Sequence, residues 1–245
     1  MPFVLALAAL LAGPIAMTPP RALRHDIAAY PRIARPATAA ARRINAAVAR
    51  LDAAVLREAA QCRRDAGPGR GSWERAVTAT MRGPAFVSYR ATDDVDCGGA
   101  HPNDSHAAIV YDLATGAPVD WTALLGRRLA GTLTPETVAD GVKMVTLASP
   151  RLFALYAAGY DASLRAEGAP AECLGLVDTE GFGEQPLQAW LDGPRGALVL
   201  QFDLNHAMQA CSTPVALSAD VLRREGASRR LVAALLAARR AGRPR

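Results

Sequence analysis

The four cysteines, Cys62, Cys97, Cys173 and Cys211, restrict the fold of this chain more than any other feature. Their number is even, their spacing is wide, and no Cys-x-x-Cys pair indicates a zinc or redox site. Four cysteines allow three disulfide pairings. We expect Cys62–Cys97 and Cys173–Cys211, because each bridge then joins neighbouring elements within one half of the chain. The alternative is four buried thiols in a reducing compartment.

The N-terminus carries an apolar leader, MPFVLALAALLAGPIAMTPP. Its uncharged run from Phe3 to Ala16 has the length of a signal-peptide apolar region and is short for a membrane span. No Lys or Arg precedes the run, and cleavage after Ala16 would place Pro14 at the minus-three position. We therefore expect residues 1–17 to be a signal peptide or a short uncleaved anchor, and the protein to be periplasmic or secreted.

The overall composition is that of a globular protein, with 51% hydrophobic and 21% charged residues. Lys143 is the only lysine, and its context, DGVKMVTL, matches neither a phosphate-binding loop nor a Ser-x-x-Lys nucleophile pair. The net charge of +5 is concentrated near the C-terminus. A strong preference for Arg and Ala is typical of a GC-rich bacterial genome.

Residues 225–245 predict a basic amphipathic C-terminal helix or tail, because Leu231, Val232, Leu235 and Leu236 recur at helical spacing among arginines. We expect the leucines to pack on the body of the protein while the arginines stay solvated. Attraction to an anionic surface is the alternative. No aromatic residue interleaves the arginines, so nucleic acid is not an expected partner.

Helical periodicity appears in three further stretches. Residues 38–62 have apolar positions at steps of three and four, and Cys62 lies on the buried face. A second helix is expected from Thr134-Pro135-Glu136 through Val145, and a third begins at Ser149-Pro150 and continues to Leu164.

Strand patterns fill the rest of the chain, in hairpin-like succession rather than in alternation with helices. This order predicts an α+β fold, in which antiparallel strands pack with amphipathic helices and disulfides add stability, over residues 18–224. The expected strands are 74–82, 85–92, 107–113, 173–179, 187–193, 197–204 and 213–219.

The stretch CGGAHPNDSHAAIVYDLATG, residues 97–116, gathers the polar residues that invite a functional interpretation. We interpret most of it as turns and strand. Its glycines permit a chain reversal beside Cys97, and Asp112 can accept backbone N–H groups where a strand enters a tight turn. The residues of this motif are Gly98, Gly99, Ala100, His101, Pro102, Asn103, Asp112, Thr115 and Gly116, with Asn103 and Asp104 placed in a turn.

The same stretch does not have the spacing of a metal or catalytic site. His101 and His106 are five residues apart, which suits neither one helix face nor alternate positions of a strand. We therefore expect no metal ligands, no catalytic residues and no cofactor. The alternative is a wall- or glycan-directed hydrolase that uses His101 with Asp104 or Asp96, since paired acids serve glycan hydrolysis.

The motif resembles the signature of a known extracellular domain, in which Gly-Gly-Ala-His-Pro is followed by a strand that ends in Asp-Leu-x-Thr-Gly. This domain is shared by RsiV-type anti-sigma factors and PdaC-type peptidoglycan deacetylases. Similarity over most of residues 25–224 supports the resemblance, in the segments YPRI, INAAV, QAWLDGPRGALVLQFDL and VALSADVL.

The resemblance implies an α+β domain outside the cytoplasmic membrane that binds without catalysis. The implied partners are a lysozyme-like envelope protein or peptidoglycan and its glycan, without sigma-factor binding or deacetylation. We therefore expect a non-catalytic interaction module of the bacterial envelope.

Overall fold

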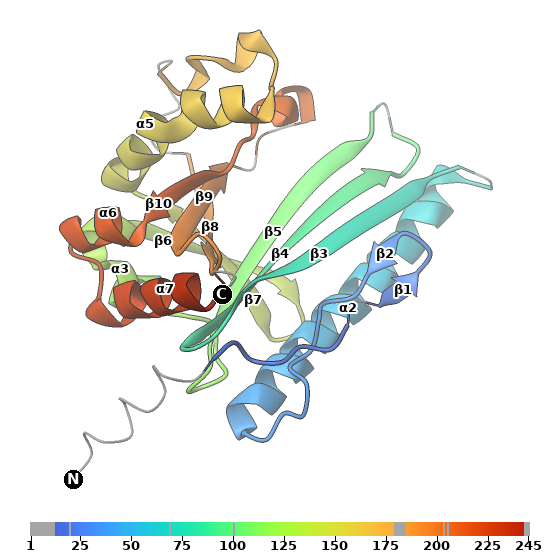
Figure 1. Ribbon diagram of the computed structural model, residues 1–245. Coiled ribbons are helices and arrows are strands. Elements are labelled where there is room, and N and C mark those ends of the chain that lie inside the picture. Colours follow the sequence, from blue (N-terminus) through green and yellow to red (C-terminus); the bar gives the residue numbers. More distant parts are fainter. Residues whose placement is uncertain are drawn as a thin grey trace.

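The computed structural model describes residues 13–19, 21–68, 70–99, 101–178, 185–202, 204 and 206–242. They form an α+β fold with two largely antiparallel sheets, in the strand orders β1-β2-β3-β4-β5 and β10-β9-β8-β7-β6. Figure 1 shows helix α2 running along the first sheet, and helices α3, α5, α6 and α7 gathered around the second. The expected fold class is therefore confirmed.

The first sheet is built on three long strands, β3 (Ser72–Arg82), β4 (Phe86–Asp96) and β5 (Asn103–Asp112). They pair in antiparallel succession, as the alternating sequence predicts. Two short strands, β1 (Ala22–Arg24) and β2 (Ile27–Ala28), extend the sheet beyond β3.

Helix α2 (Ala39–Ala66) covers one face of the first sheet. The Thr38 hydroxyl caps its N-terminus by accepting the Ala41 amide proton, at 3.0 Å. The predicted apolar stripe is buried against the sheet, where it meets Val87, Tyr89, Ile109 and Tyr111. The helix extends one turn beyond the predicted end at Cys62.

The second sheet carries the larger core of the protein. Its strands are β6 (Thr132–Ala139), β7 (Val142–Ala148), β8 (Leu187–Asp192), β9 (Ala197–Phe202) and β10 (Val215–Ser218). The helices that pack with it are α3 (Trp121–Leu125), α4 (Arg127–Ala130), α5 (Pro150–Glu167), α6 (Ala219–Arg224) and α7 (Arg229–Ala241).

The two sheets pack against each other over only part of their area. The Ser88 hydroxyl of β4 accepts the Leu191 amide proton of β8 at 3.1 Å. The Gln188 side chain of β8 donates to the His106 carbonyl of β5. We call the end of β4 and β5 near Ser88 the inner end, and the end near Asp94 the outer end. The second sheet covers the inner end.

The second predicted helix is wrong, since residues 132–148 form the β6–β7 hairpin. The turn at Asp140-Gly141, with Gly141 at φ 67°, reverses the chain. An Asp-Gly pair between β-branched residues is a hairpin signal, and it outweighs the helical spacing of Val138, Val142 and Val145.

The strand expected at residues 173–179 is also wrong. The chain there forms two short 3₁₀ helices, η1 (Ala171–Cys173) and η2 (Leu176–Asp178), while Thr179 lies outside the described residues. A third 3₁₀ helix, η3 (His206–Cys211), follows β9. In contrast, α5 begins at Pro150 as predicted, with Ser149 as its N-cap, and the stripe from Leu152 to Leu164 is buried.

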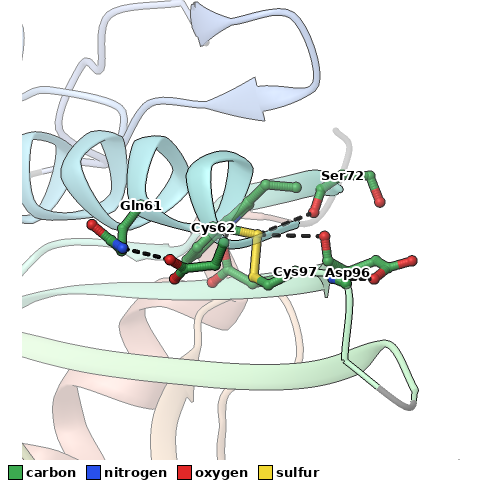
Figure 2. Close-up of a disulfide and its surroundings, with 9 residues drawn as sticks. Gln61, Cys62, Ser72, Asp96 and Cys97 are labelled. Carbon is green, nitrogen blue, oxygen red and sulfur yellow. Dashed lines mark hydrogen bonds between the residues drawn. A yellow bond between two sulfur atoms is a disulfide. The ribbon is translucent and has the colours of Figure 1, made fainter. Parts of the chain in front are cut away.

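Two disulfides tie these elements together. Cys62 is joined to Cys97 with a Cα–Cα distance of 4.7 Å, and Cys173 to Cys211 with 5.1 Å. Figure 2 shows the Cys62 sulfur near the carbonyl groups of Ser72 and Asp96, where the end of α2 meets β3 and β4. The second bridge holds η1 beside η3.

Helix α7 packs on the body through Leu231, Val232 and Leu235, all buried, as its apolar spacing predicts. Arg230 differs from the expectation that the arginines of this helix stay solvated. Its guanidinium makes a two-pronged ion pair with Asp112, at 2.5 and 2.8 Å, and lies 4.8 Å from the centre of the Phe86 ring.

Part of the leader lies outside the described residues, which begin at Gly13. The Ile15 amide donates to the Arg82 carbonyl at 2.8 Å, and the Thr18 amide donates to the Arg32 carbonyl at 2.8 Å. This stretch therefore lies against the folded body. Among the described helices, none is both long and apolar enough to cross a membrane.

Removing the Cys173–Cys211 bridge by a Cys173→Ser, Cys211→Ser double substitution should lower the free energy of unfolding by about 3–4 kcal/mol, because the unfolded chain regains the entropy of an open loop. Urea unfolding under non-reducing conditions measures this loss. Peptide mapping of the oxidised wild type should recover the same two pairs, and a peptide joining Cys62 or Cys97 to Cys173 or Cys211 would contradict the connectivity.

Leu235→Ala should destabilise the protein by about 2–5 kcal/mol, because it empties a fully buried site under α7. Arg240→Ala, at an exposed position of the same helix, should change stability by no more than about 0.5 kcal/mol. Equal effects in thermal or urea unfolding would show that α7 does not dock through its apolar stripe.

Candidate functional site

The residues of the Gly-Gly-Ala-His-Pro motif are divided between the two ends of strand β5. Cys97 to Gly99, His101 and Pro102 lie at the outer end, whereas Asp112 to Gly116 lie at and beyond the inner end. Nine strand residues at about 3.4 Å each separate the two groups by roughly 30 Å. The motif therefore does not converge on a single site.

Two of its glycines hold the ends of helix α2. Gly98 has φ 79°, and a Cβ atom there would lie 2.8 Å from the Cα atom of Ala66. Gly116 has φ 74°, and a Cβ atom there would lie 2.5 Å from the carbonyl oxygen of Ala40. Both positions need glycine for its backbone angle and for its size.

Asp112 accepts the Ala114 amide proton at 2.8 Å, which is the turn role predicted for it. Its ion pair with Arg230 is a tertiary contact that the sequence did not indicate. The Arg230 hydrogen bond lowers the pKa of Asp112 more than burial raises it. The Thr115 hydroxyl accepts the Ala117 amide proton at 3.2 Å, so this end of the motif is structural.

The outer end differs from the predicted turn. Asn103 and Asp104 belong to β5, because they pair with Val95 and Asp94 of β4 and continue the ladder. Among the residues of described geometry, Gly98 but not Gly99 has a positive φ, so one glycine makes the reversal. His101 and Pro102 are exposed at the tip, and Ala100 lies outside the described residues.

The two histidines of the motif lie in different surroundings. His101 is at the exposed tip, while His106 is half-buried in the strand, on the face turned away from α2. Over the described ranges, no group of three or more His, Cys, Asp or Glu side chains is placed to hold a metal ion.

A polar cleft of about 880 Å³ lies on the face of the first sheet opposite α2. Its floor is formed by residues 74–76 of β3, 90 and 92–94 of β4, and 104 and 106 of β5, and its wall by the η3 region together with Glu167 and Gln201. We consider six of the lining residues for its chemistry, three acidic ones at the outer end and three other polar ones: Glu74, Asp94, Asp104, Arg90, His106 and Gln209.

The wall of the cleft is held by α5 and by a disulfide. The Tyr156 hydroxyl donates to the Thr213 carbonyl at 2.7 Å, and the Tyr160 hydroxyl donates to the Cys211 carbonyl at 2.8 Å. Cys211 is also bonded to Cys173. The wall is thus braced by buried contacts on the side away from the cleft.

Arg90 marks the inner end of the cleft. Its Nη2 donates to the Gln201 side-chain oxygen at 3.1 Å, and its guanidinium lies 5.1 Å from the centre of the Trp190 ring. Burial lowers the pKa of Arg90, and the charge of Glu167 partly opposes this effect. In the described part of the chain, its Nε atom is buried and has no hydrogen-bond partner.

Two further polar residues of the cleft lining have buried atoms that are unpaired among the described residues. Gln209 is 8% exposed, yet neither its amide nitrogen nor its amide oxygen has a partner. The His106 Nδ1 atom is also buried and unpaired. Burial, with a contribution from Arg90, lowers the pKa of His106 to about 4, so the ring is neutral at neutral pH.

Arg75 and Asp93 also border the cleft, but their side chains form a buried pair that packs with Tyr30 and Trp73. The two groups are 3.7 Å apart, and the Trp73 ring donates to Asp93 at 2.7 Å. Burial raises the pKa of Asp93, although Arg75 and Trp73 oppose it. Because other residues of the protein already pair with these two charges, we assign the pair a structural role.

Of the residues considered from the sequence for a hydrolase, Asp104 lines the cleft, whereas Asp96 and His101 are not among its lining residues. Sequence analysis considered His106 only as a metal ligand and missed Arg90 and Gln209. A signal was present for Arg90, since polar residues occupy alternate positions of β4 at Ser88, Arg90, Thr92 and Asp94. No local pattern marks Gln209, because a different segment brings it to the sheet.

No family model matches the chain, and a search of curated proteins finds no match. Among solved structures, the crystal structure of a DUF3298 family protein from Pseudomonas aeruginosa PAO1 is similar, with a TM-score of 0.45 and 15% sequence identity. The alignment covers 73% of this chain and 70% of that one. A likeness at this level leaves the function to be argued from the cleft itself.

The stability of the protein should fall as the pH drops from about 6.5 toward 4, in part because of His106. Its pKa is lowered from 6.5 to about 4 in the folded protein, so the unfolded chain takes up this proton first. His106→Gln should reduce the slope of unfolding free energy against pH in this window, measured by urea unfolding. Identical slopes in both proteins would contradict the low pKa.

Proposed function

We propose that this protein is an exported, non-catalytic binding module of the bacterial envelope, and that its ligand occupies the polar cleft. The observation that carries the proposal is that Arg90, His106 and Gln209, each with a buried polar atom unpaired among the described residues, all line one cleft. A buried polar group without a partner costs about 1–3 kcal/mol. A ligand that supplies the missing hydrogen bonds would recover that free energy.

Export is supported by two features. The leader MPFVLALAALLAGPIAM has the composition of a signal peptide or short anchor. Disulfides persist in the periplasm and outside the cell, and the two bridges brace α2 and the cleft wall. The envelope partners that suit such a module are a lysozyme-like protein or peptidoglycan and its fragments.

The geometry favours binding over the alternative of a hydrolase that uses His101 with Asp104 or Asp96. Only Asp104 of these three lines the cleft. Asp104 pairs in register with Asp94 instead, and both side chains are exposed. Purified oxidised protein should therefore bind without converting its ligand. A turnover that His101→Ala abolishes while thermal stability is kept would refute the proposal.

Gln209→Leu should weaken ligand binding several-fold to tenfold without lowering stability. Leucine fills similar space, and removing an unsatisfied buried amide is neutral or stabilising. Isothermal titration with lysozyme and with soluble peptidoglycan fragments measures the binding, and urea unfolding measures the stability.

The matched control is Gln61→Leu, an exposed glutamine on α2 that should leave binding unchanged. Binding of neither probe by the wild type would refute the proposed function. So would binding that Gln209→Leu and Gln61→Leu leave equally unaffected.

A further inference from the structure

The outer end of the cleft holds three carboxylates in one row across the sheet. Asp94 lies directly opposite Glu74 on one neighbouring strand and opposite Asp104 on the other. All three are exposed, and none has a cationic partner within 4.0 Å among the described residues. Like charges directly opposite on adjacent strands are destabilising, so this row is a cost to the folded protein.

The inner end has the opposite charge. Arg90 is partly buried, and the described residues place no carboxylate within 4.0 Å of it. Glu167, also in the lining, acts on it from farther away and is engaged with Thr213, whose hydroxyl lies 2.8 Å from the Glu167 carboxylate. The free-energy cost of removing the guanidinium from water is therefore not fully offset, because no anion lies close to it among the described residues.

The unpaired Gln209 is a second, independent indication of a ligand in this cleft. Its side chain is 8% exposed, lines the same cleft, and leaves both a donor and an acceptor unused in the described structure. An amide that offers both is suited to a peptide bond, which carries one N–H and one C=O.

The spacing of the two charged ends also suits a peptide. Arg90 and Asp94 are four residues apart on β4, which is roughly 13 Å of strand. Three or four extended peptide residues span that distance. The row between them, Ala76, Thr92 and the neutral His106, adds no formal charge at neutral pH.

We propose that the cleft binds a short zwitterionic peptide, with a carboxylate of the peptide beside Arg90 and an ammonium group beside Glu74, Asp94 and Asp104. This inference rests on the proposed binding function and names its ligand class. Wall peptides, which carry both amines and carboxylates, belong to that class. Binding places a positive charge against the acidic row and a negative charge against Arg90, and Gln209 bonds the peptide backbone.

The test uses ligands altered at one charge at a time, with the full oxidised protein. The probe is the tripeptide L-alanyl-γ-D-glutamyl-meso-diaminopimelic acid, titrated by calorimetry. Acetylation of its amines and, separately, amidation of its carboxylates should each weaken binding about tenfold or more, because each removes a charge-assisted contact. Higher salt should weaken binding as well, since the acidic row is exposed.

Variants assign each charge to its end of the cleft. An Asp94→Asn, Asp104→Asn double substitution should remove the preference for free over acetylated amines, and Arg90→Gln should remove the preference for free over amidated carboxylates. The matched controls are Asp140→Asn in the β6–β7 turn and Arg63→Gln on α2, both exposed and outside this cleft, which should keep both preferences. The modified ligands test the proposal even if Arg90→Gln fails to fold.

The outcomes distinguish a failure of the peptide assignment from a failure of the proposed binding function. If lysozyme or a glycan fragment binds and Gln209→Leu weakens it, while the tripeptide does not bind, the peptide assignment is wrong and the binding function stands. Equal affinity for the free, acetylated and amidated tripeptides would also overturn the assignment. If none of the probes binds, both proposals fail.

Discussion

The packing of helix α2 against the first sheet is the contact on which the rest of the structure depends. The helix is held at one end by Gly116 against Ala40, and at the other by Gly98 against Ala66 with the Cys62–Cys97 bridge beside it. These contacts require close approach of backbone to backbone, which a side chain at either glycine would prevent. Once α2 covers this face, the opposite face of the same strands must serve both the second sheet and solvent.

The cleft follows from that division. Strands β3 to β5 are long, and the second sheet covers only their inner ends. On β4, the residues that face the second sheet and the cleft change from the buried Phe86 at the inner end to the exposed Asp94 at the outer end. The wall of the cleft comes from the η3 segment, far along the chain, which a disulfide and two tyrosines of α5 hold in place. A polar site is thus built on a rigid sheet and closed by a braced segment.

Local patterns correctly predicted the helices and strands in which the spacing of apolar residues agrees with the capping or turn residues at the ends. Helix α2 has its Thr38 cap and its apolar stripe, and the β8–β9 hairpin has its Asp192 to Gly196 turn. Where two signals disagreed, the prediction was wrong. The Thr134 segment has helical spacing and a Pro, yet Asp140-Gly141 made it a hairpin. The stretch after Cys173 looks like a strand in apolar content, but it finds no ladder partner among the described strands and forms 3₁₀ turns.

The amino-acid sequence by itself determined the fold class, most helices and strands, the turn at Asp112, and the apolar face by which α7 docks, because each depends on residues close together in the chain. Only the tertiary structure decided which polar residues share a site. The motif that drew attention in the sequence is divided between two ends of one strand, while Arg90, His106 and Gln209 come from three separate segments. Cross-strand register and helix docking set those distances, and neither can be worked out from neighbours along the chain.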